Sequence, residues 1–98
     1  MGSVMAQEQA AARVFKALSV DTRVAILQLL KTRSLCVNAL ADRLGVTPAA
    51  VSQHLRILRD AGLVIPEKHG YYVHYRVNEA TLADWRDLAE DLLSPPAR

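Results

Sequence analysis

Apolar residues recur at helical spacing in the middle of the chain and then stop at a short break. The first run places them three and four positions apart, as on a buried helix face: Val37, Leu40, Ala41 and Leu44. Gly45 follows, where a helix commonly ends in left-handed backbone. Thr47 can then accept a backbone N–H as an N-cap, and Pro48 suits the first position of a new helix. The pattern predicts two helices joined by a short turn, which is a helix-turn-helix.

The second helix of this motif is predicted to bury one face and expose a hydrogen-bonding one. Its apolar positions are Val51, Leu55 and Leu58, and it ends at Ala61-Gly62. The opposite face carries Ala49, Ser52, Gln53 and Arg56. Arg can bind guanine and Gln adenine through paired hydrogen bonds, and the helix N-terminus near Thr47 and Ala49 favours a phosphate. The alternative is a polar face that contacts only water. We expect this helix to read DNA in the major groove.

After Gly62 the apolar period changes from helical to alternating. Leu63–Ile65 predicts a short strand stopped by Pro66, and Tyr71–Val77 predicts a second strand. The polar connection 67–70 ends in Gly70, as a hairpin bend requires. A hairpin after a helix-turn-helix is the order of a winged helix, so the expected fold is mainly α with a small β-hairpin. We expect Lys68, His69 and Tyr71, near the tip of this wing, to contact DNA, unless the tip is merely solvated.

Three further helices are predicted to surround the motif. An Ala-rich helix covers Gln7–Leu18, Asp21 caps a largely apolar helix over Thr22–Lys31, and an amphipathic helix covers Ala80–Leu93. The apolar stripes of the first and last helices exceed what so small a core can bury, so we assign part of each to a two-fold homodimer interface. The residues assigned are Val14, Leu18, Leu82, Trp85, Leu88, Ala89 and Leu92. The alternative is that both stripes only complete the core of a monomer.

Composition narrows the class of protein. The 98 residues suit one domain, with residues 1–6 and 94–98 expected as flexible tails, and no apolar run is long enough for a membrane span. One Cys excludes an intrachain disulfide framework and favours the cytoplasm. The net charge is only +2, yet basic residues gather near the proposed DNA-binding surface while acidic residues gather in the last helix. No catalytic constellation or cofactor motif is found, so no enzyme is expected.

The chain resembles the ArsR/SmtB family of dimeric winged-helix repressors. The sequence Val51-Ser52-Gln53-His54-Leu55-Arg56-Ile57-Leu58-Arg59-Asp60-Ala61-Gly62-Leu63-Val64 is very similar to the family's recognition-helix signature. The segment from Phe15 to Leu27 resembles the entry into the second helix, with Val20-Asp21 where Asp-Pro is usual, and the hairpin resembles the family's wing. The resemblance implies a homodimer that binds an imperfect inverted repeat in double-stranded DNA, under the control of an effector that remains unidentified. His54, within the signature, is expected either to pack or to contact DNA.

The family's metal-sensing positions are incomplete in this chain. The segment 35–40 resembles the thiol box of metal-binding members, but Cys36 is followed by Asn38 where a second Cys is usual. The last helix supplies Asp84, Asp87, Glu90 and Asp91 without a histidine. We therefore expect neither usual metal site. Cys36 is interpreted as a packing residue or, alternatively, as a redox switch. Two further alternatives are a metal sensor using an unrecognised site and a winged helix that binds protein instead of DNA.

Overall fold

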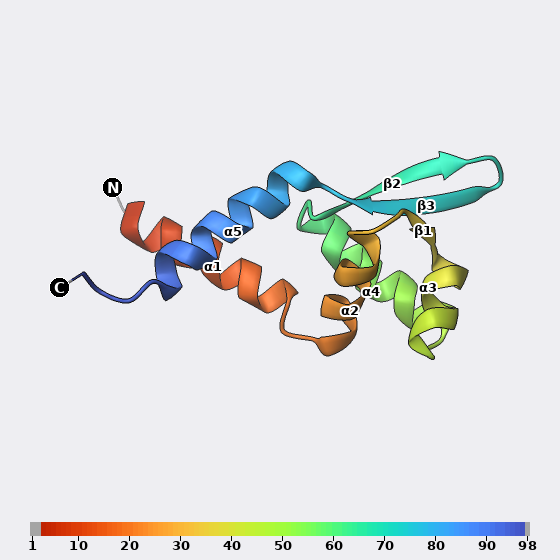
Figure 1. Ribbon diagram of the computed structural model, residues 1–98, viewed down its shortest axis with the longest axis horizontal. Helices are drawn as coiled ribbons and strands as arrows, with labels where there is room; N and C mark the ends of the chain where they lie inside the picture. The colour runs from red at the N-terminus through yellow and green to blue at the C-terminus, as the bar shows by residue number, and fades with distance from the viewer. Residues whose placement is uncertain (1–2, 98) are drawn as a thin grey trace.

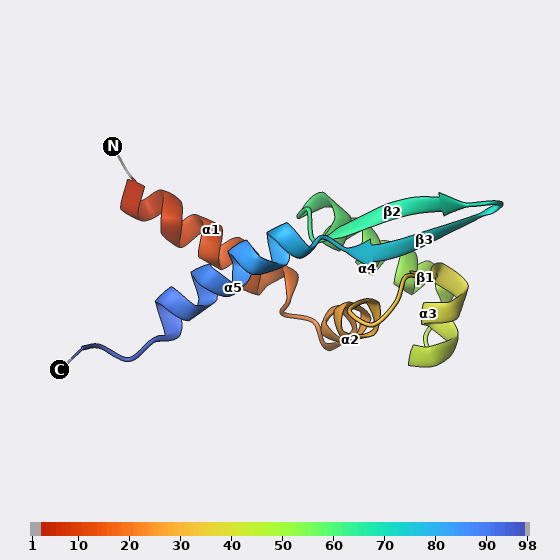
Figure 2. The same ribbon diagram turned by 45° about the horizontal axis from the view of Figure 1, so that its top comes forward.

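The computed structural model describes residues 3–97 as five helices and a small three-stranded antiparallel sheet (Figure 1). In chain order the elements are α1 (Ser3–Ala17), α2 (Asp21–Leu30), β1 (Leu35–Cys36), α3 (Val37–Leu44), α4 (Pro48–Asp60), β2 (Val64–His69), β3 (Tyr72–Val77) and α5 (Glu79–Leu93). The molecule is elongated, 52 × 25 × 21 Å, because α1 and α5 extend away from the rest (Figure 2). The helix-turn-helix and the hairpin that follows it give the predicted winged-helix order.

The core lies where α2, α3 and α4 meet the base of the sheet. Its fully buried side chains come from all three helices, from the residue before β2 and from the first residue of β2: Ile26, Leu40, Val51, Leu55, Leu58, Leu63 and Val64. The predicted inward stripe of α4 is therefore confirmed. Burying one such side chain stabilises the fold by roughly 1.5–3 kcal/mol, so these contacts hold α4 firmly against its neighbours.

The turn between α3 and α4 has the predicted geometry. Gly45 ends α3 in left-handed backbone with φ of 67°, and Val46 N–H donates back to the Ala41 carbonyl at 3.2 Å. The Thr47 hydroxyl then accepts the Ala50 N–H at 3.1 Å, while Pro48 occupies the first turn of α4. Each residue thus satisfies or avoids a backbone group that a helix end leaves unpaired.

The sheet is larger than the sequence predicted. Its strand order is β1-β3-β2, and β1, which was not predicted, pairs Leu35 with Tyr75 and Cys36 with His74. The expectation that Pro66 stops the first strand is wrong, because β2 continues to His69. Since β2 is an edge strand, a proline there is compatible with the sheet.

The hairpin tip is also shorter than expected. It consists of Gly70 and Tyr71 alone, and His69 and Tyr72 are already paired across the strands. Gly70 has φ of 63°, whereas Tyr71, the second residue of the bend, does not have a positive φ. This combination matches a type II′ bend with glycine first. Lys68 and His69 therefore belong to the strand, and the prediction of a polar tip over 67–70 is corrected.

Several boundaries differ from the predicted ones. Helix α1 begins at Ser3, so the expected tail over 1–6 is helical from that residue, whereas residues 1, 2 and 98 lie outside the described part. Asp21 does not cap α2; Val20 is the N-cap, and the Asp21 carboxylate accepts the Thr22 N–H at 2.7 Å inside the first turn. Helix α5 begins one residue early, because the Asn78 side chain caps it by accepting the Thr81 N–H.

Candidate nucleic-acid interface

Helix α4 presents a polar outer face opposite its buried stripe. Val51 and Leu55 are 0% and 1% exposed, whereas the side chains predicted to read DNA are exposed: Ala49, Ser52, Gln53 and Arg56. The Thr47 N-cap lies at the same end and is exposed as well. The structure therefore brings the predicted residues together on one outer face of α4, from its N-terminal end to Arg56. The N-terminal part of the second helix is what contacts base edges in helix-turn-helix proteins.

The cations of this region differ in their partners. Arg59 lies 3.6 Å from Asp60, and Arg76 binds Glu67. Within residues 3–97, Arg56 and Lys68 form no ion pair. Arg56 is therefore free to donate its planar set of N–H groups to a base edge or phosphate without first giving up a carboxylate.

His54 is placed differently from the rest of the predicted DNA-binding set. It is half-buried on the inner flank of α4, and its Nδ1 lies 3.4 Å from a terminal guanidinium nitrogen of Arg23 on α2. Ser52, Gln53 and Arg56 extend outward from the same helix, so His54 is the member of the set that contacts the chain's own interior.

The wing divides the other predicted contacts between its two faces. Facing pairs of an antiparallel sheet point the same way, so Lys68 shares a face with Val73, and His69 shares the opposite face with Tyr72. Tyr71 is fully exposed at the tip, and Tyr72 beside it is 61% exposed. The side chain at the tip is therefore aromatic rather than basic. This was missed from the sequence because the first strand was predicted to end at Pro66, which placed Lys68 and His69 in the bend.

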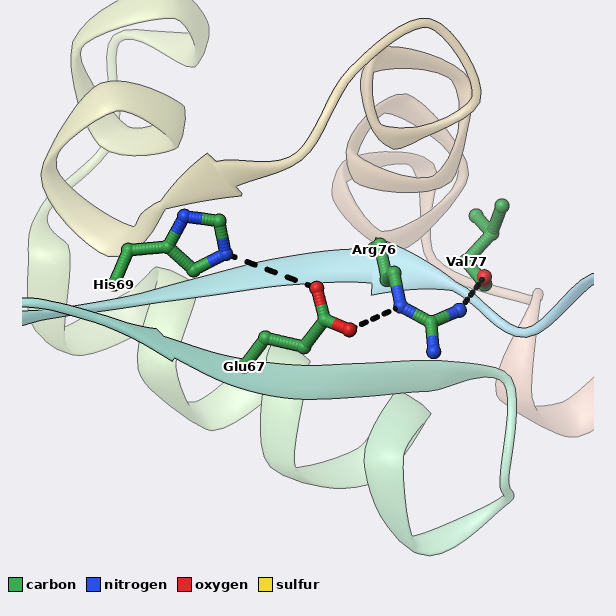
Figure 3. Close-up of polar contacts among 4 residues, drawn as sticks. All are labelled: Glu67, His69, Arg76 and Val77. Carbon is green, nitrogen blue, oxygen red and sulfur yellow. Dashed lines mark hydrogen bonds and ion pairs between the residues drawn. The ribbon is translucent and has the colours of Figure 1, made fainter.

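A cluster centred on the Glu67 carboxylate lies on the face of the wing opposite Lys68 (Figure 3). Arg76 Nε donates to Glu67 Oε2 at 2.8 Å, and His69 Nε2 lies 3.7 Å from Glu67 Oε1. Arg76 and then His69 hold the pKa of Glu67 below its ordinary value of 4.5. The His69 and His74 rings stack in parallel with centroids 4.5 Å apart. The cluster joins the two strands of the hairpin on the side away from Lys68.

Helices α1 and α5 pack on each other but leave apolar surface uncovered. No residue described in α5 is fully buried, and Leu92 is 57% exposed. An open groove of about 830 Å³ between the two helices is lined by Ala11, Ala12, Phe15, Leu88 and Leu92, with acidic side chains beside them. Of the predicted interface residues, Val14 is only 3% exposed within the single chain, and Leu18, Leu82 and Trp85 pack partly on its core.

The predicted sensor positions are dispersed. Cys36 is half-buried at the N-cap of α3 and forms no disulfide. Among residues 3–97 of the single chain, no three side chains of the metal-ligating types lie together. The absence of a metal site nevertheless stays a prediction.

None of the described helices combines the length and the apolar character that a membrane crossing requires.

Comparison with known sequences places this geometry in a family. Residues 21–65, from α2 to the start of β2, match the model of the "Bacterial regulatory protein, arsR family". The repressor SmtB of Mycobacterium tuberculosis is 42% identical over 74 residues, which are 76% of this chain but 55% of SmtB. The uncharacterised regulator YbzH of Bacillus subtilis is 36% identical over 89 residues, with 76% of this chain and 89% of YbzH covered. The chain thus spans just over half the length of SmtB and most of YbzH.

Solved structures with the same fold cover nearly the whole chain. Reduced HlyU from Vibrio cholerae superposes with a TM-score of 0.76 at 29% identity, covering 97% of this chain and all of HlyU. An ArsR-like transcriptional regulator from Rhodococcus gives 0.77 at 35% identity, with 87% and 80% covered. A winged helix-turn-helix DNA-binding domain from Mycobacterium bovis, described as homodimeric, gives 0.72 at 28% identity, with 96% and 91% covered. The fold is therefore a winged helix-turn-helix, and the chain belongs to the ArsR family of bacterial regulatory proteins.

Proposed function

We propose that this chain acts as a homodimeric, sequence-specific DNA-binding regulator that represses transcription, without either of the family's usual metal sites. The observation that carries the proposal is the joint exposure of Ser52, Gln53 and Arg56 on a helix whose other face is fixed in the core. Relatives that are named as transcriptional repressors support the repressor part of the proposal.

The α4 helix supplies the base contacts in this proposal. Gln53 and Arg56 have the side chains that bind adenine and guanine in paired fashion, and Ser52 can bind a base edge or a phosphate. The capped N-terminus at Thr47 favours a phosphate of the backbone. The wing adds contacts from Lys68 and His69 on its two faces and from Tyr71 at its tip.

The α1–α5 surface supplies the dimer contact. Its exposed apolar side chains, Phe15 and Leu92 among them, remain in water unless a partner covers them. A second copy of the chain offers the same surface about a two-fold axis, which is the commonest symmetry of oligomers. The homodimeric relative from Mycobacterium bovis supports this arrangement. Two α4 helices related by that axis would bind two halves of an inverted repeat.

The proposal is tested by selection from a pool of random DNA duplexes with the purified chain. We expect enrichment of one inverted repeat, bound by two chains. A matched selection with the triple variant Ser52→Ala, Gln53→Ala and Arg56→Ala, which keeps the core of α4, should enrich no repeat. Failure of the native chain to enrich any inverted repeat would overturn the proposal.

A further inference from the structure

Arg23 is the one buried side chain of polar or charged type among the residues whose burial is described. Only 8% of the residue is exposed, although α2 is otherwise apolar on its inner side. No carboxylate of the described residues pairs with its guanidinium. A charge in such a place is costly unless hydrogen bonds replace the lost water, so its partners reveal its role.

Two partners of Arg23 are carbonyls at the end of α1. Its Nε donates to the Ala17 carbonyl at 2.6 Å, and one terminal nitrogen donates to the Lys16 carbonyl at 3.3 Å. The last carbonyls of a helix have no partner within the helix and carry partial negative charge. Arg23 therefore anchors the C-terminal end of α1 to α2.

The third partner of Arg23 lies on α4. The other terminal nitrogen of Arg23 is 3.4 Å from His54 Nδ1. Because a guanidinium only donates hydrogen bonds, His54 Nδ1 is the acceptor in this contact. The guanidinium thus connects three helices. It belongs to a residue of α2, donates to two carbonyls of α1 and contacts His54 on α4.

This contact matters because α1 and α4 otherwise pack on different partners. Helix α1 packs chiefly on α5, whereas α4 packs on α2, α3 and β2. We propose that the Arg23–His54 contact fixes the direction of α4 relative to α1 and thereby sets the spacing of the two half-sites that a dimer recognises. The inference rests on the proposed function, in which α1 belongs to the dimer contact and α4 reads DNA.

The spacing of selected sites tests this inference. Fixed half-sites are joined by spacers of varied length, and the native chain should prefer one length over its neighbours. His54→Leu removes the acceptor and should reduce that preference by about three- to tenfold, as expected for loss of one hydrogen bond of ordinary strength. His54→Gln keeps an acceptor and should restore the native spacing, which a side chain that only fills space would not do. Gln53→Leu, the neighbouring outward position, should alter the preferred half-site bases but not the spacing.

The possible outcomes separate this inference from the proposed function. If the native chain selects no inverted repeat, the proposed function fails. If it does, and His54→Leu keeps the native spacer preference or changes only the half-site bases, the positioning role fails. Arg23→Lys is the second variant, since one ammonium cannot hold three acceptors in the same fixed plane. It should also broaden the spacer preference while remaining dimeric by light scattering, and an unchanged preference would contradict the inference.

Discussion

Arg76 of β3 donates a 2.8 Å hydrogen bond from Nε to the Glu67 carboxylate of β2, and this ion pair crosses the hairpin of the wing (Figure 3). The pair keeps Glu67 ionised in the folded chain, with a pKa below the ordinary value. A carboxylate of this kind stabilises the fold above its ordinary pKa, and the contribution is lost as the pH falls through the lowered folded value.

Glu67→Gln should therefore weaken the acid sensitivity of the fold. Thermal unfolding followed at a series of pH values should show the native chain losing stability below about pH 4.5, and the variant losing less. Glu90→Gln is a matched control, because Glu90 is exposed and forms no ion pair in the described part of the chain. Equal acid sensitivity of the native chain and Glu67→Gln would contradict the assignment.

Gly45→Ala should destabilise the fold by about 1–2 kcal/mol, since Gly45 adopts left-handed backbone with φ of 67°. A Cβ there would meet no atom within 4 Å, so the cost comes from the backbone conformation and not from a clash. Gly45→Asn should cost less because Asn tolerates this region better. Chemical denaturation measures both changes, and equal losses for Ala and Asn would argue against this origin.

Lys68→Ala should weaken binding to every DNA sequence by a similar factor. If Lys68 contacts one phosphate in each chain, the slope of log affinity against log salt falls by about 0.9 per chain. Titrations at several salt concentrations measure this slope. Lys31→Ala removes the same charge at the C-cap of α2, away from the proposed DNA-binding residues, and should leave the slope unchanged. A similar fall in both variants would indicate only a net-charge effect.

Leu92→Glu should convert the chain from dimer to monomer, because it places a charge on the most exposed apolar part of the α1–α5 groove. Light scattering gives the mass directly. Leu92 is a better site than Trp85, which packs partly on the chain's own core, so that its loss also disturbs the monomer. A dimer that persists in Leu92→Glu would refute this interface.

The sequence signals were sufficient where a structure depends on neighbours along the chain. Gly45, Thr47 and Pro48 define the turn between α3 and α4 locally, so it could be predicted residue by residue. Pro66 misled because its effect depends on whether β2 is an edge strand, which is a property of the whole sheet. The two-residue strand β1 carries too short a pattern to detect.

The contact of Arg23 with His54 on α4 could not be predicted from spacing, since the two residues are 31 positions apart in the chain. The available signal was a lone cation within a strongly apolar helix. The sequence also could not show which apolar residues are covered within one chain, as Val14 illustrates. A helical stripe identifies an apolar face, but only the packing of α1 on α5 shows that Val14 is covered within one chain while Leu92 is not.

The most direct test of base recognition by α4 measures the affinity of the native chain, Gln53→Ala and Arg56→Ala for a complete set of single-base variants of the selected site. Each substitution should abolish discrimination of about 1–3 kcal/mol at one base pair in each half-site and leave the other positions unchanged. A uniform loss of affinity across all the variants, or no loss at all, would contradict the claim that these side chains read the bases.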